Sequence, residues 1–149
     1  MKPYIPDELI GSTFEEIILD ANSRQCECDG MAHYLSYRFN NDTKTQLSVY
    51  EGLLVVNGKR TPHHVWTVFE NDGTQYLIDL RARMWIPSDE DTPHGIYPLS
   101  EVASSYLGQP THRTWGNFSG GLIELLFPSL EVFEKEIEKL REAEKLASK

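Results

Sequence analysis

The apolar residues near the start of the chain follow the periodicity of two helices. The first apolar stripe comprises Phe14, Ile17, Ile18 and Ala21. Its spacing predicts a helix over about residues 13–21, and the segment Ser12-Thr-Phe-Glu15 is typical of the capping box that begins such a helix. The second stripe comprises Met31, Ala32, Leu35 and Phe39. It predicts a helix that begins near Cys28 and ends at Asn40-Asn41-Asp42.

From Thr45 onward the pattern becomes that of β-strands. Apolar and β-branched runs cover about residues 47–56 and 65–69, and a third run is Tyr76-Leu-Ile-Asp79. Asn71-Asp72-Gly73 separates the last two runs and indicates a tight hairpin turn, because glycine tolerates the positive φ that the turn needs. We therefore expect these two strands to be antiparallel neighbours, with residue 64 paired near residue 80.

The second half of the chain is less regular. Residues 86–121 are rich in Pro, Gly, Ser and Thr, which is typical of long connections with a few short elements, where binding loops often lie. The stripe Phe133, Ile137 and Leu140 then predicts a last helix from Leu130 to about Ala147, most simply a packing helix. Helices, then antiparallel strands, then a helix indicate an α+β fold. A length of 149 residues favours a single domain over 1–149.

Charge and composition exclude several classes of function. The chain has 14 Lys and Arg against 23 Asp and Glu, a formal net charge of −9, which would repel nucleic acid and anionic membranes. No stretch approaches the roughly 18 apolar residues of a membrane span, and the N-terminus lacks the apolar region of a secretory signal. The two cysteines, Cys26 and Cys28, form no disulfide framework. We therefore expect free thiols and a cytoplasmic location.

Three residues carry candidate chemistry. Cys28 lies at the start of the second predicted helix, where the unpaired amides and the helix dipole favour the nucleophilic thiolate and could bind a developing oxyanion. His64 lies at the head of one hairpin strand and Asp79 at the end of the other. The hairpin can bring these two side by side. The acid would then orient the imidazole, whose second nitrogen would face the thiol.

These residues occur in a recognisable pattern. Cys28-Asp-Gly30-Met-Ala32 is followed by His64-Val-Trp66, the Gly73 turn and Asp79, and Asp79 comes fifteen positions after His64. Over residues 26–80 the chain resembles the transglutaminase-like superfamily of papain-fold cysteine enzymes. The resemblance implies a papain/transglutaminase-like core, in which a helix begins at the nucleophile Cys28 and packs on an antiparallel sheet. It also implies that His64 is the general base and then the acid, and that Asp79 orients it. The sequence departs from the family at Met31, where an aromatic residue is usual.

Other residues compete for these roles. Cys26 would be the nucleophile if the helix began earlier, and Gln25 could supply an oxyanion-hole amide. His63 competes with His64, but strand alternation places the two on opposite faces, and His64 shares its face with Trp66. Zinc binding is disfavoured, because Cys-x-Cys is not the usual spacing of a zinc ligand pair.

The sequence therefore predicts a cysteine-dependent acyl-transfer enzyme that acts on protein or peptide amides. With water as acceptor it would be a hydrolase, either a cysteine protease or a glutamine deamidase, and with an amine acceptor it would be a transglutaminase. This chemistry needs no metal or cofactor. The oligomeric state is not predicted, and a role as an effector secreted without a signal peptide stays open. The alternative is a non-catalytic protein-binding domain, an adaptor or an immunity-type inhibitor, in which Cys28 would be an ordinary thiol.

Overall fold

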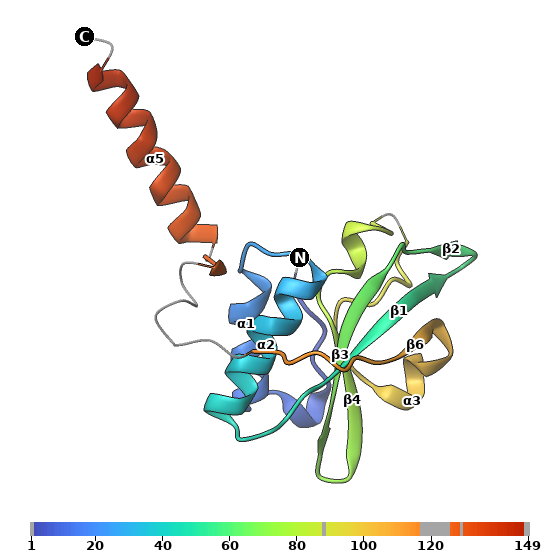
Figure 1. Cartoon of the computed structure of the whole chain (residues 1–149). Helices are drawn as coiled ribbons and strands as arrows, with labels where there is room; N and C mark the ends of the chain where they lie inside the picture. Colours follow the sequence, from blue (N-terminus) through green and yellow to red (C-terminus); the bar gives the residue numbers. More distant parts are fainter. Residues whose placement is uncertain (1, 88, 117–125, 129, 148–149) are drawn as a thin grey trace.

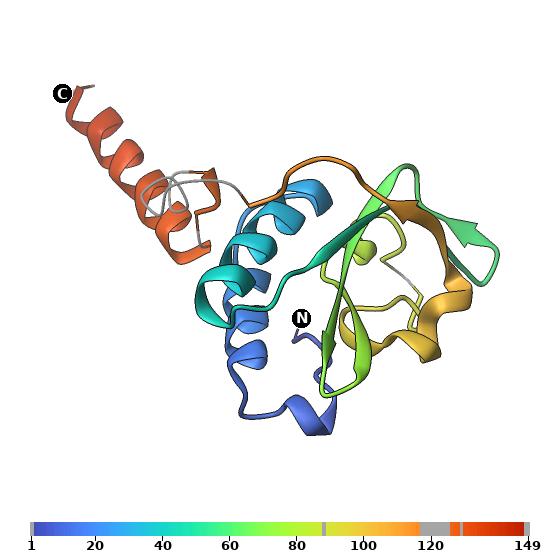
Figure 2. The same cartoon turned by 60° about the horizontal axis from the view of Figure 1, so that its bottom comes forward.

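Two helices pack side by side at the N-terminal end of the chain (Figures 1 and 2). The computed structural model describes residues 2–87, 89–116, 126–128 and 130–147, without the side chains of 130–137. The helices are α1 (Thr13–Asn22) and α2 (Cys28–Asp42). Both predicted helices are therefore confirmed, and Cys28 is the first residue of α2.

The N-terminus of α1 differs from the predicted capping box in one contact. The Ser12 Oγ accepts a hydrogen bond from the Glu15 amide at 3.3 Å, as predicted. The Glu15 carboxylate instead accepts from the Gly11 amide at 3.2 Å, because the Ser12 amide already donates to the Leu9 carbonyl. The cap thus extends one residue further back.

A curled antiparallel sheet forms the second layer. Its strands are β1 (Ser48–Val56), β2 (Lys59–Arg60), β3 (His64–Asn71), β4 (Thr74–Asp79), β5 (Gly95–Pro98) and β6 (Tyr106–Pro110). They follow the order β2-β1-β3-β4-β5, and β6 pairs with β1. Tyr50, Glu51 and Gly52 pair with both β3 and β6, so these two strands lie on opposite edges of β1. The predicted α+β class, with N-terminal helices packed on an antiparallel sheet, is therefore confirmed.

The β3–β4 hairpin is confirmed, and its register determines which side chains meet. Asp72 and Gly73 have φ values of 51° and 80°, as a tight two-residue turn requires. The observed pairs run from Asn71↔Thr74 to Thr67↔Ile78. Continued to the start of β3, this register places His64 opposite Arg81, one residue beyond the predicted partner. Because side chains alternate between the two faces, it is this register that gives His64 and Asp79 the same face.

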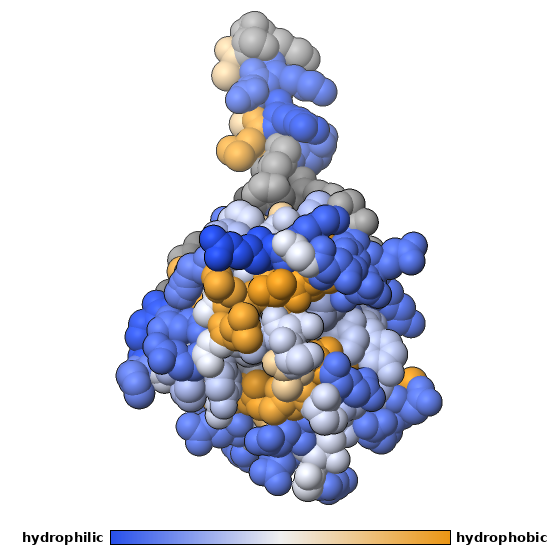
Figure 3. All heavy atoms as spheres, turned by 90° about the vertical axis from the view of Figure 1, so that its right-hand side faces the viewer, coloured by the Kyte–Doolittle hydropathy of each residue, from blue (hydrophilic) through white to orange (hydrophobic). Residues whose placement is uncertain are grey.

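Each face of the sheet has its own apolar core. On the helix side, Phe69, Tyr76 and Ile78 pack with α1 and α2 around the fully buried Phe39. On the other side, Trp66, Val68 and Leu77 pack with Leu54 and Tyr106. That second side carries a small cleft of about 130 Å³ next to Leu99 and Ala103. Seen from the direction of β6 and α3, apolar residues reach the surface in two areas separated by more polar ones (Figure 3).

Residues 86–121 contain more regular structure than their composition predicts. They include β5, β6, α3 (Leu99–Val102) and a 3-10 turn at Ala103–Ser105, while residues 117–121 lie outside the described part. Glycine is the reason the strands were missed. A Cβ atom at Gly108 would lie 2.2 Å from the Glu51 carbonyl oxygen, so a residue that indicates a loop in the sequence here permits close strand pairing.

The predicted last helix is also present, as α5 (Leu130–Ala147). It leads away from the two layers (Figures 1 and 2), and its described side chains, from residue 138 onward, are exposed, with Leu140 65% accessible. The expectation of a packing helix is therefore wrong for residues 138–147. The side chains of Phe133 and Ile137 lie outside the described residues. Within the described ranges, no helix combines the length and apolar character needed to cross a membrane.

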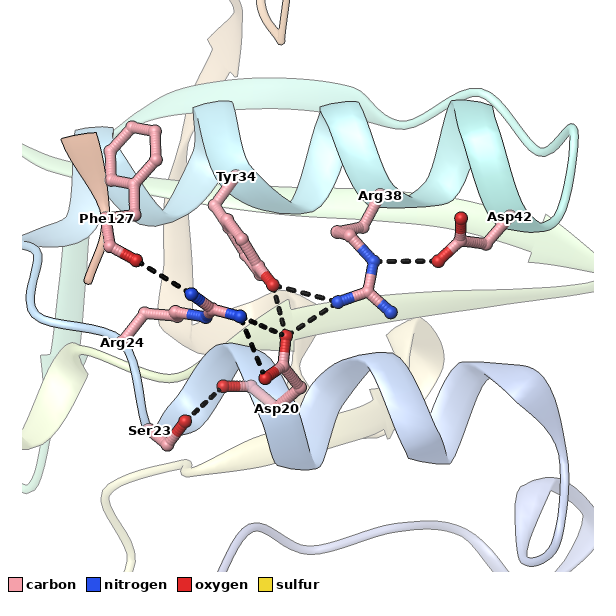
Figure 4. A network of polar contacts seen from close by, with 7 residues as sticks. All are labelled: Asp20, Ser23, Arg24, Tyr34, Arg38, Asp42 and Phe127. Atoms are coloured by element: carbon pink, nitrogen blue, oxygen red, sulfur yellow. Dashed lines mark hydrogen bonds and ion pairs between the residues drawn. The ribbon is translucent and has the colours of Figure 1, made fainter. Parts of the chain in front are cut away.

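A polar network joins α1 to α2 (Figure 4). Asp20 on α1 accepts hydrogen bonds from Arg24, from Arg38 at 2.6 Å and from the Tyr34 hydroxyl. Arg24 also donates to the Phe127 carbonyl oxygen at 3.1 Å. Burial, and then the hydrogen bond to Asp20, raise the pKa of Tyr34 to about 12, so its hydroxyl remains a donor. The network fixes the position of α2, and therefore of Cys28, relative to the rest of the helix layer.

Replacing the central acceptor of this network should destabilise the protein. We expect Asp20→Asn to lower the free energy of unfolding by about 1–3 kcal/mol, because hydrogen bonds between charged groups are lost. Asp42→Asn is the matched control. It removes a more exposed ion pair with Arg38 at the edge of the same network and should cost at most about 1 kcal/mol. Urea denaturation of the three proteins gives the comparison. Equal losses in the two variants would contradict a central role for Asp20.

Candidate active site

Cys28 combines a helix N-terminus with partial exposure. Glu27 is the N-cap of α2 and Cys28 follows it directly. The Gly30 amide donates to Asp29 Oδ1 at 2.9 Å, and the amides of Cys28 and Asp29 precede the first intrahelical hydrogen bond. The thiol is partly exposed and packs against a small apolar cluster of Ala32, Val49 and Val65.

The structure brings His64 and Asp79 together. The His64 Nε2 lies 2.7 Å from Asp79 Oδ2, and the two residues are 0% and 3% exposed. The prediction that the hairpin places these side chains next to each other is confirmed. With Nε2 bound to the acid, the Nδ1 atom has no hydrogen-bond partner of ordinary geometry among the described residues, and it is the nitrogen available to the Cys28 thiol.

The Asp79 carboxylate is held by four donors. Its Oδ2 accepts from His64 and from the Tyr106 hydroxyl at 2.8 Å. Its Oδ1 accepts from the backbone amides of Arg81 and Ala82 at 3.1 and 3.0 Å. An ionised carboxylate only accepts hydrogen bonds, so this environment suits the charged form and fixes the plane of the group.

The acid and the thiol both act on the imidazole. Burial, the largest influence, lowers the pKa of His64, but the charge and hydrogen bond of Asp79, followed by the Cys28 thiol, together outweigh it and raise that pKa to about 10. A ring with this pKa is protonated at neutral pH. Burial, and then the charge of Asp79, also raise the pKa of Tyr106, which remains a neutral donor.

Cys26, the competing nucleophile, lies in a different environment. Burial raises the pKa of its thiol, and the charge of Arg81 opposes this rise. Arg81 Nε also donates to the Cys26 carbonyl oxygen at 2.8 Å, and a Cβ at Gly30 would lie 2.9 Å from Cys26 Cβ. Cys26 therefore packs inward beside a structural arginine, whereas Cys28 lies at the histidine.

The other competing residues lie at the surface. The His63 side chain is 58% exposed, and its Nε2 is 3.3 Å from a Glu51 carboxylate oxygen. Gln25 is exposed, and its backbone amide donates to the Pro128 carbonyl oxygen at 2.9 Å. Trp66 is buried in the core, as expected.

Two residues near the site were missed from the sequence. Tyr106 reaches Asp79 from β6, and Trp115 packs against the same small cluster as Cys28. Both come from the segment that resembles a long loop, and a single sequence carries no signal for the pairing of β6 with β1 that positions them. Cys28, His64 and Asp79, in contrast, each lie in a short motif of neighbouring residues, and such motifs can be identified from the sequence.

The chain matches no protein-family model, no curated protein and no solved structure. The described side chains include no group of three His, Cys, Asp or Glu placed to hold a metal ion.

The protonation state of His64 can be tested directly. We expect the ring of the wild type to stay protonated up to about pH 10, and in Asp79→Asn to deprotonate near or below 6.5, the value of an ordinary histidine, because the main compensation for burial is lost. Ring ¹⁵N and ¹³C chemical shifts measured against pH give the answer. The exposed His63 ring is the internal control, and its chemical shifts should not differ between the two proteins.

The raised pKa of His64 makes the free energy of unfolding depend on pH. The folded-state pKa of His64, about 10, lies above the unfolded value, so its contribution to stability is complete below about pH 6.5 and is lost as pH rises towards 10. The free energy of unfolding of the wild type should therefore exceed that of Asp79→Asn more at pH 7 than at pH 10. A constant difference would contradict the charged pair.

Proposed function

We propose that the chain is a cysteine-dependent acyl-transfer enzyme that acts on protein or peptide amides, on a papain/transglutaminase-like core. Cys28 is the nucleophile, His64 the general acid and base, and Asp79 the residue that orients the histidine. The observation that carries this proposal is the buried His64–Asp79 pair, whose free Nδ1 adjoins a partly exposed thiol at a helix N-terminus. A merely structural thiol needs neither a charged histidine nor a fixed acid beside it.

The first half of the reaction forms a thioester. The Cys28 thiolate attacks the carbonyl carbon of the amide, and a C–S bond forms. The carbonyl oxygen becomes an oxyanion, which the unpaired amides at the start of α2 can bind. The His64 imidazolium then donates its Nδ1 proton to the leaving nitrogen as the C–N bond breaks, and the amine departs.

The second half returns the enzyme to its starting state. Neutral His64 accepts a proton from water or from an amine as that acceptor attacks the thioester carbon. The C–S bond breaks, and Cys28 leaves as the thiolate beside the re-formed imidazolium. Asp79 keeps Nε2 as a donor and Nδ1 directed at the sulfur throughout. No step needs a metal or a cofactor.

The acceptor determines the product. Water would give a carboxylic acid, by proteolysis of a peptide bond or deamidation of a glutamine, and an amine would give a new amide cross-link. All three share the acyl-enzyme formed on Cys28, so the first test addresses that thiol.

We expect iodoacetamide to alkylate Cys28 quickly well below pH 8, with mass spectrometry to assign each thiol. In His64→Ala the rate at pH 6.5 should fall about tenfold to a hundredfold, because an ordinary thiol with a pKa near 8.5 is only about 1% thiolate there. His63→Ala is the matched control and should label like the wild type, since this neighbouring ring is exposed and paired with Glu51.

Other outcomes of the labelling experiment would contradict the enzyme, the nucleophile or the base that is proposed. If Cys28 reacts no faster than a free thiol, the enzyme proposal fails and a non-catalytic protein-binding domain becomes the better explanation. If Cys26 is the hyper-reactive thiol, the nucleophile assigned here is wrong. If His63→Ala slows labelling as much as His64→Ala, the assignment of the base is wrong.

A further inference from the structure

A large polar groove runs beside the helix that carries Cys28. It has a volume of about 630 Å³, within the range of ligand-binding sites. Its walls are α2, the start of β1 and the chain that follows β6. The described lining residues are Ser36, Asn40, Gln46, Leu47, Ser48, Val49, Pro110, Thr111, Arg113, Thr114, Trp115 and Gly116.

The groove approaches the thiol along one side of α2. Cys28, Ala32, Ser36 and Asn40 recur every four residues, and residues at this spacing are neighbours on a helix surface. The last two line the groove. Val49 and Trp115 line it as well. Val49 belongs to the small cluster against which Cys28 packs, and Trp115 packs against the same cluster. A chain lying in the groove would therefore lead towards the nucleophile.

One edge of the chain at the start of β1 lies in the groove and pairs with no strand among the described residues. The pairing of β6 with β1 begins at Tyr50, and the Thr111 amide donates to the Val49 carbonyl oxygen at 2.8 Å. Beyond this point, the described residues leave the same edge of Gln46–Ser48 without a strand partner. Extended peptides bind such edges by adding a strand.

The charges of the groove favour an acidic occupant. None of the described lining residues is acidic, although the chain carries a net charge of −9. The Arg113 guanidinium lies over the Trp115 ring, 4.4 Å from its centroid, and the described residues offer it no carboxylate or hydrogen-bond acceptor. The Ser36 Oγ is buried and has no hydrogen-bond partner among the same residues. Arg113 is exposed, and an arginine stacked on an aromatic ring with its N–H donors directed to solvent suits a carboxylate.

We propose that this groove is the substrate-binding subsite, and that it takes an extended peptide segment with acidic side chains, one of which pairs with Arg113. The proposal rests on the proposed function for the role of the bound peptide as substrate. The binding of the peptide does not depend on it.

The binding test uses the Cys28→Ser protein, which cannot form the thioester. Rhodamine-labelled peptides (Gly-Glu-Ser)₃, (Gly-Gln-Ser)₃ and (Gly-Lys-Ser)₃ are compared by fluorescence anisotropy. We expect the glutamate peptide to bind about tenfold tighter than the glutamine peptide, the effect of one charge-assisted hydrogen bond, and the lysine peptide to bind most weakly.

Arg113→Gln should abolish the preference for glutamate. Arg60→Gln is the matched control, because Arg60 is an exposed arginine on β2 that contributes the same charge but does not line the groove. The preference should survive in that variant. Equal affinity for all three peptides, or the same loss in both variants, would overturn the proposal.

A second measurement connects the groove to Cys28. Chloromethyl ketones of the glutamate and lysine peptides are compared as alkylating agents for the wild type. The glutamate reagent should label Cys28 faster, and Arg113→Gln should remove that difference. Slow iodoacetamide labelling would count against the enzyme, whereas selective peptide binding in Cys28→Ser would still support the groove. Fast iodoacetamide labelling without peptide selectivity would overturn the groove alone.

Discussion

The hydrogen bond between His64 Nε2 and Asp79 Oδ2 is the interaction on which the arrangement of the site depends. Its 2.7 Å length and almost complete burial place two charged groups out of water, which is costly unless every remaining lone pair is satisfied. The structure meets this requirement with the backbone amides that follow β4 and with a tyrosine hydroxyl from β6. The acid is thus fixed from two sides. Because Nε2 is bound to the acid, only the Nδ1 atom of the imidazole is left to face Cys28.

Two independent parts of the fold bring the thiol to that nitrogen. The hairpin register gives the histidine and the acid one face at the end of β3 and β4. The network around Asp20 holds α2 against α1 and so fixes where the N-terminus of α2 lies. The apolar core between helices and sheet joins the two parts. The site therefore lies where the two layers meet, and its geometry depends on both.

The sequence predicted what is encoded locally and missed what depends on long-range pairing. Helical stripes, the Ser12 cap and the Asp72-Gly73 turn each need only a few neighbouring residues, and all were found. The pairing of β6 with β1 joins residues more than fifty positions apart. Its glycine, Gly108, indicates a loop when read alone. Tyr106 and Trp115 were missed with it, although one bonds the acid and the other packs beside the cluster that contacts the thiol.

The segment from Tyr106 to Gly116 runs from the Asp79 carboxylate to the proposed peptide groove. Its first residue donates to Asp79, and its last part lines the groove and donates from Gly116 to His33 Nδ1 on α2 at 3.2 Å. Between these ends it pairs with β1, which leaves little freedom to shift one end alone. A peptide added to the edge of β1 beside this segment would adjoin the strand that holds the tyrosine. The same strand therefore contributes to the position of the acid and to the wall of the groove.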